Sequence, residues 1–155
     1  MKVYYLTLKL IFLSHTYLLS QNFTTDKVVK TDLKWKTQLT NIEYNVLRLS
    51  DTEKAFSGKY NKFYKEGIYL CKGCDTPLFR SEHKYDSGSG WPSFDRGIKG
   101  HIGYTTDKEL GYTRTEIHCY VCNGHLGHVF NDGPKKTTGQ RYCVNSVALK
   151  FKPLK

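Results

Sequence analysis

The 155 residues suit one domain of ordinary size, and a content of 39% hydrophobic and 14% aromatic residues excludes a polytopic membrane protein and a disordered chain. The 24 Lys and Arg residues exceed the 14 Asp and Glu residues, which gives a net charge of +10. Because these basic residues are scattered and form no basic helix stripe, we interpret them as solubilising charge and expect no nucleic-acid partner. A monomer is the default expectation.

Residues 1–21 resemble a secretory signal peptide, with one lysine near the start and an apolar stretch behind it. Lys9 interrupts that stretch and leaves it too short for a membrane-spanning helix, and Ser20 is the small residue available for cleavage. We therefore predict export after cleavage, with a retained membrane-associated N-terminus or a cytoplasmic protein as alternatives. Residues 22–32 are then a polar, mobile linker, and the domain spans 33–155.

A helix is predicted next, because Thr40 and Glu43 have the spacing of a capping box and apolar residues follow through Leu49. From Gly67 onward the chain consists of short β-prone runs that glycine turns separate. These features predict an α+β domain of mainly antiparallel strands with one or two N-terminal helices. The clearest predicted strands are Ile68–Cys71, Thr113–Cys119 and Tyr142–Phe151.

Four of the five cysteines form two Cys-x-x-Cys pairs, Cys71 with Cys74 and Cys119 with Cys122, each at the end of a predicted strand. Such turns can direct four thiolates at one point, across a spacer much longer than that of a small zinc finger. Four sulfurs complete a tetrahedral Zn²⁺ site and leave no open position, so we favour a structural zinc site with catalysis elsewhere. Two disulfides and a thioredoxin-like redox pair are the alternatives, and the redox pair would need a helix that opens at the Cys-x-x-Cys.

A glycine-rich loop, Ser87–Phe94, lies between the two cysteine pairs. It carries the large aromatic Trp91 to a turn that Pro92 restrains. This loop can form an apolar wall, and a tight surface turn with an anchoring tryptophan is the alternative.

Two imidazoles and a carboxylate, from His125, His128 and Asp132, come directly before a Gly-Pro turn. Imidazole is the usual proton donor near neutral pH. A pair of histidines among glycines is most often a hydrogen-bonded structural pair. Because a lone cysteine follows closely in the sequence, we favour a role in proton transfer.

The fifth cysteine, Cys143, lies in a β-prone run in which alternation puts Arg141, Cys143 and Asn145 on one face. A guanidinium close to the sulfur would favour the thiolate, which is the nucleophilic form. We therefore predict that Cys143 is reactive. The alternative is a small, buried apolar residue in a core strand.

Together these stretches resemble the B-type methionine sulfoxide reductases from about Trp35 to Phe151. The resemblance implies two antiparallel sheets with a zinc site, and it implies reduction of methionine (R)-sulfoxide, mainly within oxidised proteins, as a repair reaction. The motifs that carry it are, in order, Ser57-Gly58, Gly67–Cys71, Ser87–Phe94, HLGHVF at 125–130, DGP at 132–134 and RYCVNS at 141–146.

The resemblance also implies the roles of the site residues. Cys143 is the nucleophile that attacks the sulfoxide sulfur, releases methionine and becomes a sulfenic acid. His125 and His128 bind and protonate the oxygen. The orientation of the two imidazoles and the charge of the Cys143 sulfur are then set by Asp132, Arg141 and Asn145. Trp91 forms the wall against the substrate's S-methyl group.

One departure from the family pattern concerns the resolving cysteine that many relatives carry in the glycine loop. This chain has Ser89 there, and a serine hydroxyl cannot form a disulfide. With the other four thiols on zinc, we predict a one-cysteine cycle in which an external thiol, from a thioredoxin-like protein or a small molecule, attacks oxidised Cys143.

Two rival functions remain at this point. A zinc-ribbon binding module would explain the paired Cys-x-x-Cys turns and the charge of +10, and its binding would survive Cys143→Ser. A thiol-disulfide oxidoreductase would use one Cys-x-x-Cys pair and lose its chemistry on Cys71→Ser. The enzyme that the resemblance implies would instead lose its activity on Cys143→Ser and keep its zinc and its fold.

Overall fold

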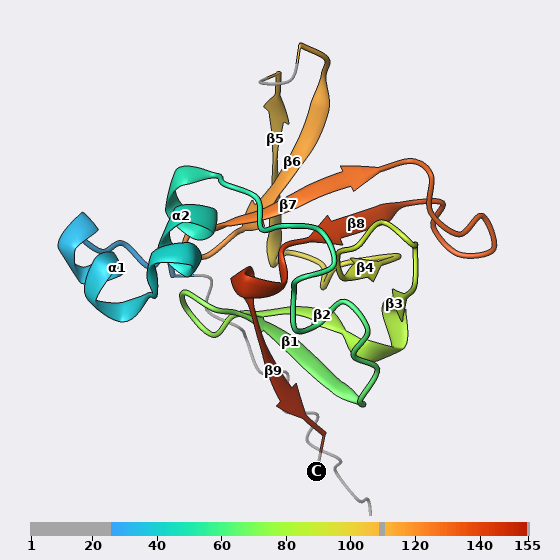
Figure 1. Ribbon diagram of the computed structural model, residues 1–155, viewed down its shortest axis with the longest axis horizontal. Coiled ribbons are helices and arrows are strands. Elements are labelled where there is room, and N and C mark those ends of the chain that lie inside the picture. Colours follow the sequence, from blue (N-terminus) through green and yellow to red (C-terminus); the bar gives the residue numbers. More distant parts are fainter. Residues whose placement is uncertain (1–25, 109–110, 155) are drawn as a thin grey trace, which may run out of the picture.

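The computed structural model describes residues 26–108 and 111–154, in which two short helices precede two antiparallel sheets (Figure 1). The predicted α+β class with mainly antiparallel strands is confirmed. The helices are α1 (Asp32–Gln38) and α2 (Asn41–Leu49). One sheet has the order β2-β1-β9 and consists of β1 (Gly67–Cys71), β2 (Pro77–Arg80) and β9 (Leu149–Pro153). The other has the order β3-β4-β8-β7-β6-β5 and consists of β3 (Lys84–Tyr85), β4 (Ser93–Phe94), β5 (Ile102–Asp107), β6 (Arg114–Cys119), β7 (His125–Phe130) and β8 (Arg141–Val144).

The predicted capping box is present at the start of α2. The Thr40 hydroxyl accepts the N–H of Glu43 at 3.4 Å, and the Glu43 carboxylate accepts the N–H of Thr40 at 3.0 Å. Two backbone donors that a helix start leaves free are thereby satisfied. The helix ends at Ser50, whose φ of 58° takes the chain away from the helix axis.

The packed part of the chain begins before residue 33. The predicted signal peptide and the first residues of the predicted linker lie outside the described residues. Val28, however, donates its N–H to the carbonyl of Val121 at 2.9 Å and packs against the core. Val28, which lies within the predicted linker, is therefore held against the core. No helix among the described residues is long and apolar enough to cross a membrane.

The run Tyr142–Phe151, which the sequence predicted as one strand, is two strands in different sheets. A 3₁₀ turn, η2 (Ser146–Ala148), separates β8 from β9. The Glu53 carboxylate accepts the N–H of Ser146 and that of Val147, the latter at 3.1 Å. A distant acceptor thus captures the two donors at the point where the strand would have continued.

Aromatic side chains fill the space between the two sheets. Phe79 of β2 stacks on Phe94 of β4 with ring centroids 4.4 Å apart, and Tyr69 of β1 meets the Phe94 ring edge-on at 5.0 Å. Tyr142 of β8 is also buried there, with its ring 6.0 Å from that of Phe79. Because strand side chains alternate, burial of Tyr142 turns Cys143 to the opposite face of the sheet.

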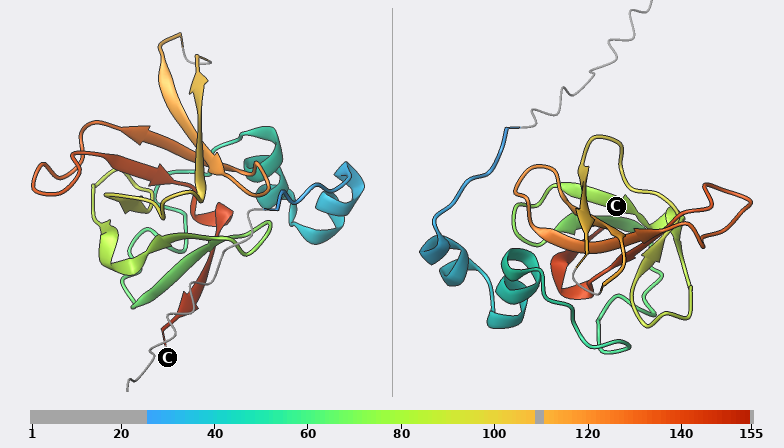
Figure 2. Two further views of the ribbon diagram at one scale, coloured as in Figure 1. Left: turned by 180° about the vertical axis from the view of Figure 1, so that it is seen from behind. Right: turned by 90° about the horizontal axis from the view of Figure 1, so that it is seen from above.

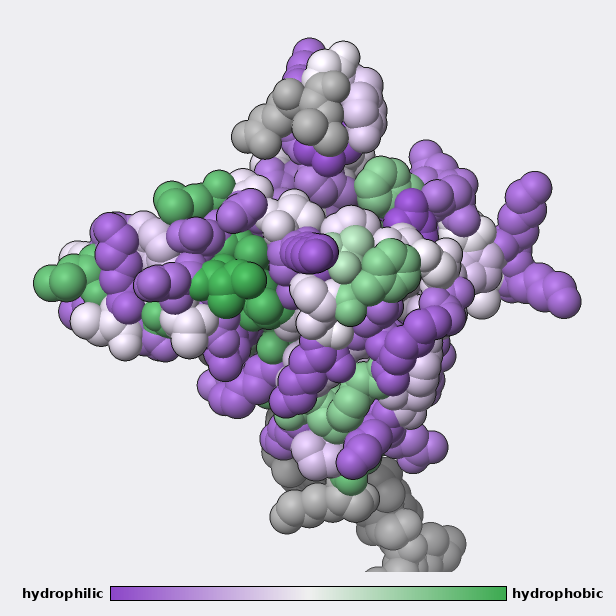
Figure 3. All heavy atoms as spheres, viewed as in Figure 1, coloured by the Kyte–Doolittle hydropathy of each residue, from purple (hydrophilic) through white to green (hydrophobic). Residues whose placement is uncertain are grey.

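The two helices lie beside one end of the sheets, and the β5–β6 hairpin projects from the body, as the views in Figures 1 and 2 agree. Most of the face shown in Figure 3 is hydrophilic, with apolar side chains gathered over the helices and near the centre of the molecule. This distribution agrees with the excess of lysine in the composition.

Candidate active site and cysteine cluster

Each Cys-x-x-Cys pair forms the same tight turn at the end of a strand. Asp75 donates its N–H to the carbonyl of Cys71, and Asn123 donates its N–H to the carbonyl of Cys119, both at 2.9 Å. Asp75 and Asn123 have φ values of 59° and 54°, in the left-handed region that Asp and Asn tolerate best among residues other than glycine. One local geometry, used twice, points each pair of sulfurs to the same side of its turn.

The four sulfurs meet in one cluster, with all the Sγ atoms within 4.8 Å of one another. The Sγ atoms of Cys71 and Cys122 are 3.6 Å apart, and those of Cys74 and Cys119 are 3.5 Å apart. All four cysteines are free, and these two distances are far longer than the S–S distance of about 2.05 Å in a disulfide. A tetrahedron with metal–sulfur distances of about 2.3 Å has edges of about 3.8 Å, so the four cysteines fit a zinc-sized ion. The four cysteines can therefore hold a metal ion.

The helices cover this cluster. Arg48 of α2 donates to the carbonyl of Cys122 at 2.8 Å, and Gln38 at the end of α1 donates to the carbonyl of Gly73 at 2.8 Å. Cys71, Cys119 and Cys122 are buried, and the buried Trp35 ring lies next to Gly73. Neither pair opens a helix, as a thioredoxin-like redox pair would. A metal ion held by these four sulfurs would have no open coordination position, as in a structural site.

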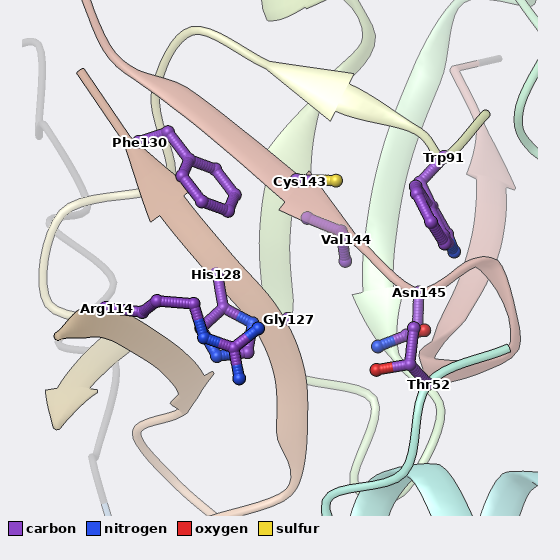
Figure 4. Close-up of a pocket in the computed structure, with 9 residues that line it drawn as sticks. All are labelled: Thr52, Trp91, Arg114, Gly127, His128, Phe130, Cys143, Val144 and Asn145. Carbon is purple, nitrogen blue, oxygen red and sulfur yellow. The ribbon is translucent and has the colours of Figure 1, made fainter. Parts of the chain in front are cut away.

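Cys143 lies in a separate cavity, which the pairing of β7 with β8 builds. Cys143 is directly opposite His128 in this pairing, so the two side chains share one face as cross-strand neighbours. Gly127 makes the close approach of the strands possible, because a Cβ there would lie 2.1 Å from the carbonyl oxygen of Cys143. In Figure 4 the sulfur points toward Trp91, and Phe130 lies on its other side.

The glycine loop places Trp91 across from the sulfur. Ser93 is paired with Cys143, and the N–H of Val144 donates to the carbonyl of Pro92 at 3.0 Å, which fixes the loop to β8. Gly90, at φ +94°, lets the loop pass Phe56, which a Cβ would approach at 3.0 Å. The resulting cavity has a volume of about 120 Å³. Its lining consists of Thr52, Trp91, Arg114, Gly127, His128, Phe130, Cys143, Val144 and Asn145.

Glu53 links two of the cavity walls through its backbone. Its carbonyl accepts the Trp91 indole N–H at 3.1 Å, and its N–H donates to the Asn145 side-chain oxygen at 3.0 Å. The Asn145 side-chain nitrogen donates in turn to the carbonyl of Leu126 at 3.2 Å. The orientation of the Asn145 amide is therefore set, with its second N–H left over for a group in the cavity.

The electrostatics of Cys143 differ from the sequence prediction. Burial raises the pKa of the thiol above its ordinary value, although a weak hydrogen bond with Ser89, at 3.9 Å, and the charge of Arg141 both lower it. Arg141 is occupied by Asp132, to which it donates twice at 2.8 Å, and its guanidinium lies over the Phe130 ring at 4.4 Å. The direction of the Arg141 effect is as predicted, but desolvation outweighs it and favours the thiol form of the resting sulfur.

The two predicted proton donors occupy different positions. His128 lines the cavity that holds Cys143, whereas His125 is 3% exposed and lines an adjoining polar cavity. The two imidazole rings are 5.7 Å apart, centroid to centroid. The structure therefore brings His128, Trp91 and Asn145 to Cys143, and it puts His125 behind His128. Asp132 and Arg141 lie beside this cavity, outside its lining.

Comparison with known proteins agrees with this geometry. Residues 39–153 match the SelR domain, which covers most of the chain. The chain belongs to the SelR domain family. Related proteins include "peptide methionine sulfoxide reductase MsrB" of Bradyrhizobium diazoefficiens, 49% identical over 84% of this chain and 94% of the relative. The protein of the same name from Leptospira interrogans is 51% identical over 81% and 95%, and "peptide methionine sulfoxide reductase B5" of Oryza sativa subsp. japonica is 48% identical over 80% and 90%.

Several residues of this SelR domain site were absent from the sequence predictions. Arg114 and Glu116 alternate on β6 and point to the same face as His128, so the polar alternation before Cys119 was a usable signal. Glu53 and Asp107 had no comparable signal, because their roles depend on partners far away in the sequence.

Proposed function

We propose that this protein reduces methionine (R)-sulfoxide to methionine, mainly within oxidised proteins, and so repairs oxidative damage. The observation that carries the proposal is the convergence of Cys143, His128, Trp91 and Asn145 on one cavity in a SelR domain chain. The names of its relatives support the same reaction. The cavity is small and largely apolar, which suits a methyl thioether side chain.

The reaction needs a nucleophilic sulfur and a proton for the oxygen. The Cys143 sulfur attacks the sulfoxide sulfur, and the oxygen is transferred to leave a sulfenic acid on Cys143 and a thioether on the substrate. The substrate sulfur is reduced by two electrons and the Cys143 sulfur is oxidised by two. Cys143 starts as a thiol, so its own proton balances the equation: thiol plus sulfoxide gives sulfenic acid plus methionine.

The cavity walls divide the tasks of binding. Trp91 and Phe130 offer an apolar surface on either side of the sulfur, and the substrate's S-methyl group fits there (Figure 4). His128 and Asn145 offer polar groups, which suit the sulfoxide oxygen. An epimer with oxygen and methyl exchanged would bring its oxygen against the indole, so the cavity accepts one epimer and excludes the other. The family resemblance implies that the accepted epimer is R.

The test compares the two epimers. Reduction of R- and S-sulfoxide, both as free methionine sulfoxide and in an oxidised protein, is measured with wild type and with Cys143→Ser. We expect activity on the R epimer alone, with the higher rate on the oxidised protein, and no activity in the variant. Reduction of the S epimer at the same rate, or activity that survives in the variant, would contradict the proposal.

We propose that Cys71, Cys74, Cys119 and Cys122 hold a structural Zn²⁺. Their distances and burial support it, since four thiolates form a closed tetrahedral site. The ion would join the ends of β1 and β6 and supply cross-linking energy rather than chemistry. Metal analysis of the purified protein should find one zinc ion per chain.

We propose a one-cysteine cycle, in which an external thiol from a thioredoxin-like protein or a small molecule attacks the oxidised Cys143. Ser89 is the residue of the glycine loop that contacts the Cys143 sulfur, and it offers only a hydroxyl. Mass spectrometry after one turnover without reductant should find one added oxygen on Cys143. In Ser89→Cys, where a second sulfur replaces that hydroxyl, an internal disulfide should form instead. An internal disulfide in wild type would contradict the one-cysteine cycle.

We also propose that the protein is exported after cleavage near residue 21 and acts as a monomer without nucleic acid. The N-terminal apolar stretch supports export. Intact-mass analysis of the mature protein would find the N-terminus near residue 22, and a full-length chain would contradict cleavage.

A further inference from the structure

A second, polar cavity lies behind the cavity of Cys143, and the His128 imidazole lines both. It has a volume of about 220 Å³, which is room for several waters. Asp107, Glu116 and His125 are among its lining residues, and Arg114 lines both cavities with His128. An imidazole at this boundary can exchange a proton with either side.

The sheet register explains why these polar groups gather. Glu116 of β6, His128 of β7 and Cys143 of β8 are directly opposite one another in consecutive strands. On β5, Thr105 is opposite Glu116, and Asp107 is opposite Arg114. Cross-strand neighbours on one face have Cβ atoms about 4.5–5.5 Å apart. The polar face of the sheet therefore leads without interruption from Cys143 to the β5 edge.

Carboxylates hold both imidazoles. His128 Nε2 lies 2.6 Å from an Asp107 carboxylate oxygen, and the Arg114 guanidinium donates to the same oxygen. His125 Nδ1 lies 2.6 Å from a Glu116 carboxylate oxygen. A carboxylate accepts, so each imidazole carries a hydrogen on the nitrogen that faces the carboxylate. His128 then has Nδ1 available as an acceptor.

The buried imidazole of His125 indicates that the second cavity contains water. Its Nε2 is buried and has no hydrogen-bond partner among the described residues. His125 itself is 3% exposed and lines the polar cavity. Buried polar atoms are satisfied by protein or by ordered water, so this nitrogen indicates water in the cavity.

We propose that Asp107, held by Arg114, is a positioning residue for a proton relay through His128, with the waters of the second cavity behind it. This inference rests on the proposed reduction of methionine sulfoxide. The Cys143 S–H bond breaks, and His128 Nδ1 takes the proton and gives it to the sulfoxide oxygen. The oxygen then leaves the substrate sulfur for the Cys143 sulfur as the hydroxyl of the sulfenic acid, so no external proton is consumed.

The charges around His128 agree with this role. Burial and the charges of Arg114 and His125 lower the pKa of His128, and the Asp107 carboxylate raises it without reversing that direction, which favours a neutral ring that can accept a proton. Once protonated, the ring is paired with the Asp107 carboxylate. The titratable and charged groups that face it from the neighbouring strands and from the end of β5 are Asp107, Lys108, Arg114, Glu116, His125 and Cys143.

The test is Asp107→Asn, measured beside a matched control. Asp95 is also a buried carboxylate that contacts an arginine and a histidine, Arg96 at 3.1 Å and His83 at 3.4 Å. Proton transfer by a positioned group contributes about 10²- to 10⁴-fold, so loss of its support should lower kcat by about tenfold or more with little change in KM. The acid limb of the pH–rate profile should move to lower pH, because loss of the Asp107 carboxylate lowers the pKa of His128. Asp95→Asn should leave kcat and the profile unchanged.

Two further measurements distinguish failure of the His128 relay from failure of the proposed function. Nitrogen-15 NMR of wild-type His128 should find the hydrogen on Nε2, a result that needs neither activity nor a variant, and a hydrogen on Nδ1 would overturn the relay even if the enzyme is active. Asp107→Glu, which keeps the carboxylate, should recover most of the rate. A rate and pH profile of Asp107→Asn equal to wild type would overturn the positioning role. Absence of R-sulfoxide reduction in wild type would overturn the proposed function instead.

Discussion

The five cysteines occupy two environments that differ in how their sulfurs are paired. Four lie in a cluster in which each sulfur has other sulfurs as neighbours, and hydrogen bonds among the thiols lower the pKa of Cys74 and Cys119 and raise those of Cys71 and Cys122. Cys143 has no sulfur near it among the described contacts, and its neighbours are a hydroxyl and a guanidinium. In the proposed function the same side chain acts as a ligand in one place and as a nucleophile in the other, because its neighbours differ.

Different interactions stabilise the chain around the four-cysteine cluster and around Cys143. At the cluster, the sulfurs of two distant chain segments lie within 4.8 Å of one another under the cover of the two helices, and the proposed zinc ion would join them. Beside Cys143, the backbone and carboxylate of Glu53 hold Trp91, Asn145 and the η2 turn in place. Cross-linking by the proposed zinc ion would leave Cys143 free of any structural task.

The largest effect is expected from loss of the cluster. Structural zinc contributes of order 10 kcal/mol of binding free energy at pH 7, so Cys122→Ser should lose the metal and unfold at a much lower temperature than wild type. Thermal melting with metal analysis measures this. Cys143→Ser is the matched control, and equal melting of the two variants would mean that the cluster does not support the fold.

Cys143→Ser should instead remove the chemistry. We expect R-sulfoxide reduction to fall by about 10⁴-fold or more, because a hydroxyl replaces the only nucleophilic sulfur of the cavity. Metal content and melting temperature should stay at the wild-type values. Steady-state kinetics and calorimetry on the same preparation check both parts, and a variant that also loses its metal would mean that the two cysteine environments are not independent.

Glu53→Gln tests the scaffold beside Cys143. An amide would turn an N–H toward one of the two backbone donors of η2, at a cost of about 1–3 kcal/mol in unfolding free energy. Burial raises the pKa of Glu53, so its contribution is fully present at pH values below its unfolded pKa and is lost as the pH rises through its folded pKa. The difference between wild type and variant should therefore shrink with rising pH.

Denaturant unfolding at several pH values measures that trend. Exposed Glu66→Gln is the control and should have no effect on stability. A difference that grows with pH would contradict the assigned direction of the Glu53 pKa.

The smallest effect is expected at Arg141. The guanidinium lowers the pKa of Cys143 against the effect of burial, so Arg141→Gln should raise that pKa and slow alkylation of Cys143 several-fold at pH 8. Asp132 raises the same pKa, and Asp132→Asn should act in the opposite direction. Rates of iodoacetamide labelling measure both. Exposed Arg80→Gln is the control, and an equal slowing there would mean that net charge alone is responsible.

Local patterns were enough to predict much of this fold. The capping box of α2, the Cys-x-x-Cys turns at strand ends and the alternation around Cys143 each depend on residues within a few positions of one another. The break between β8 and β9 could not be predicted in the same way, because the acceptor that captures the η2 donors is Glu53, more than 90 residues away.

The sequence alone determined the residue types of the site and the family resemblance, since motif order and spacing are properties of the chain itself. The tertiary structure decided which of those residues meet. It placed His128 beside Cys143 and His125 behind it, and it supplied Asp107 from a strand edge. It also decided that the pKa of Cys143 is raised, because desolvation depends on everything packed around the sulfur and outweighs the effect of the Arg141 charge.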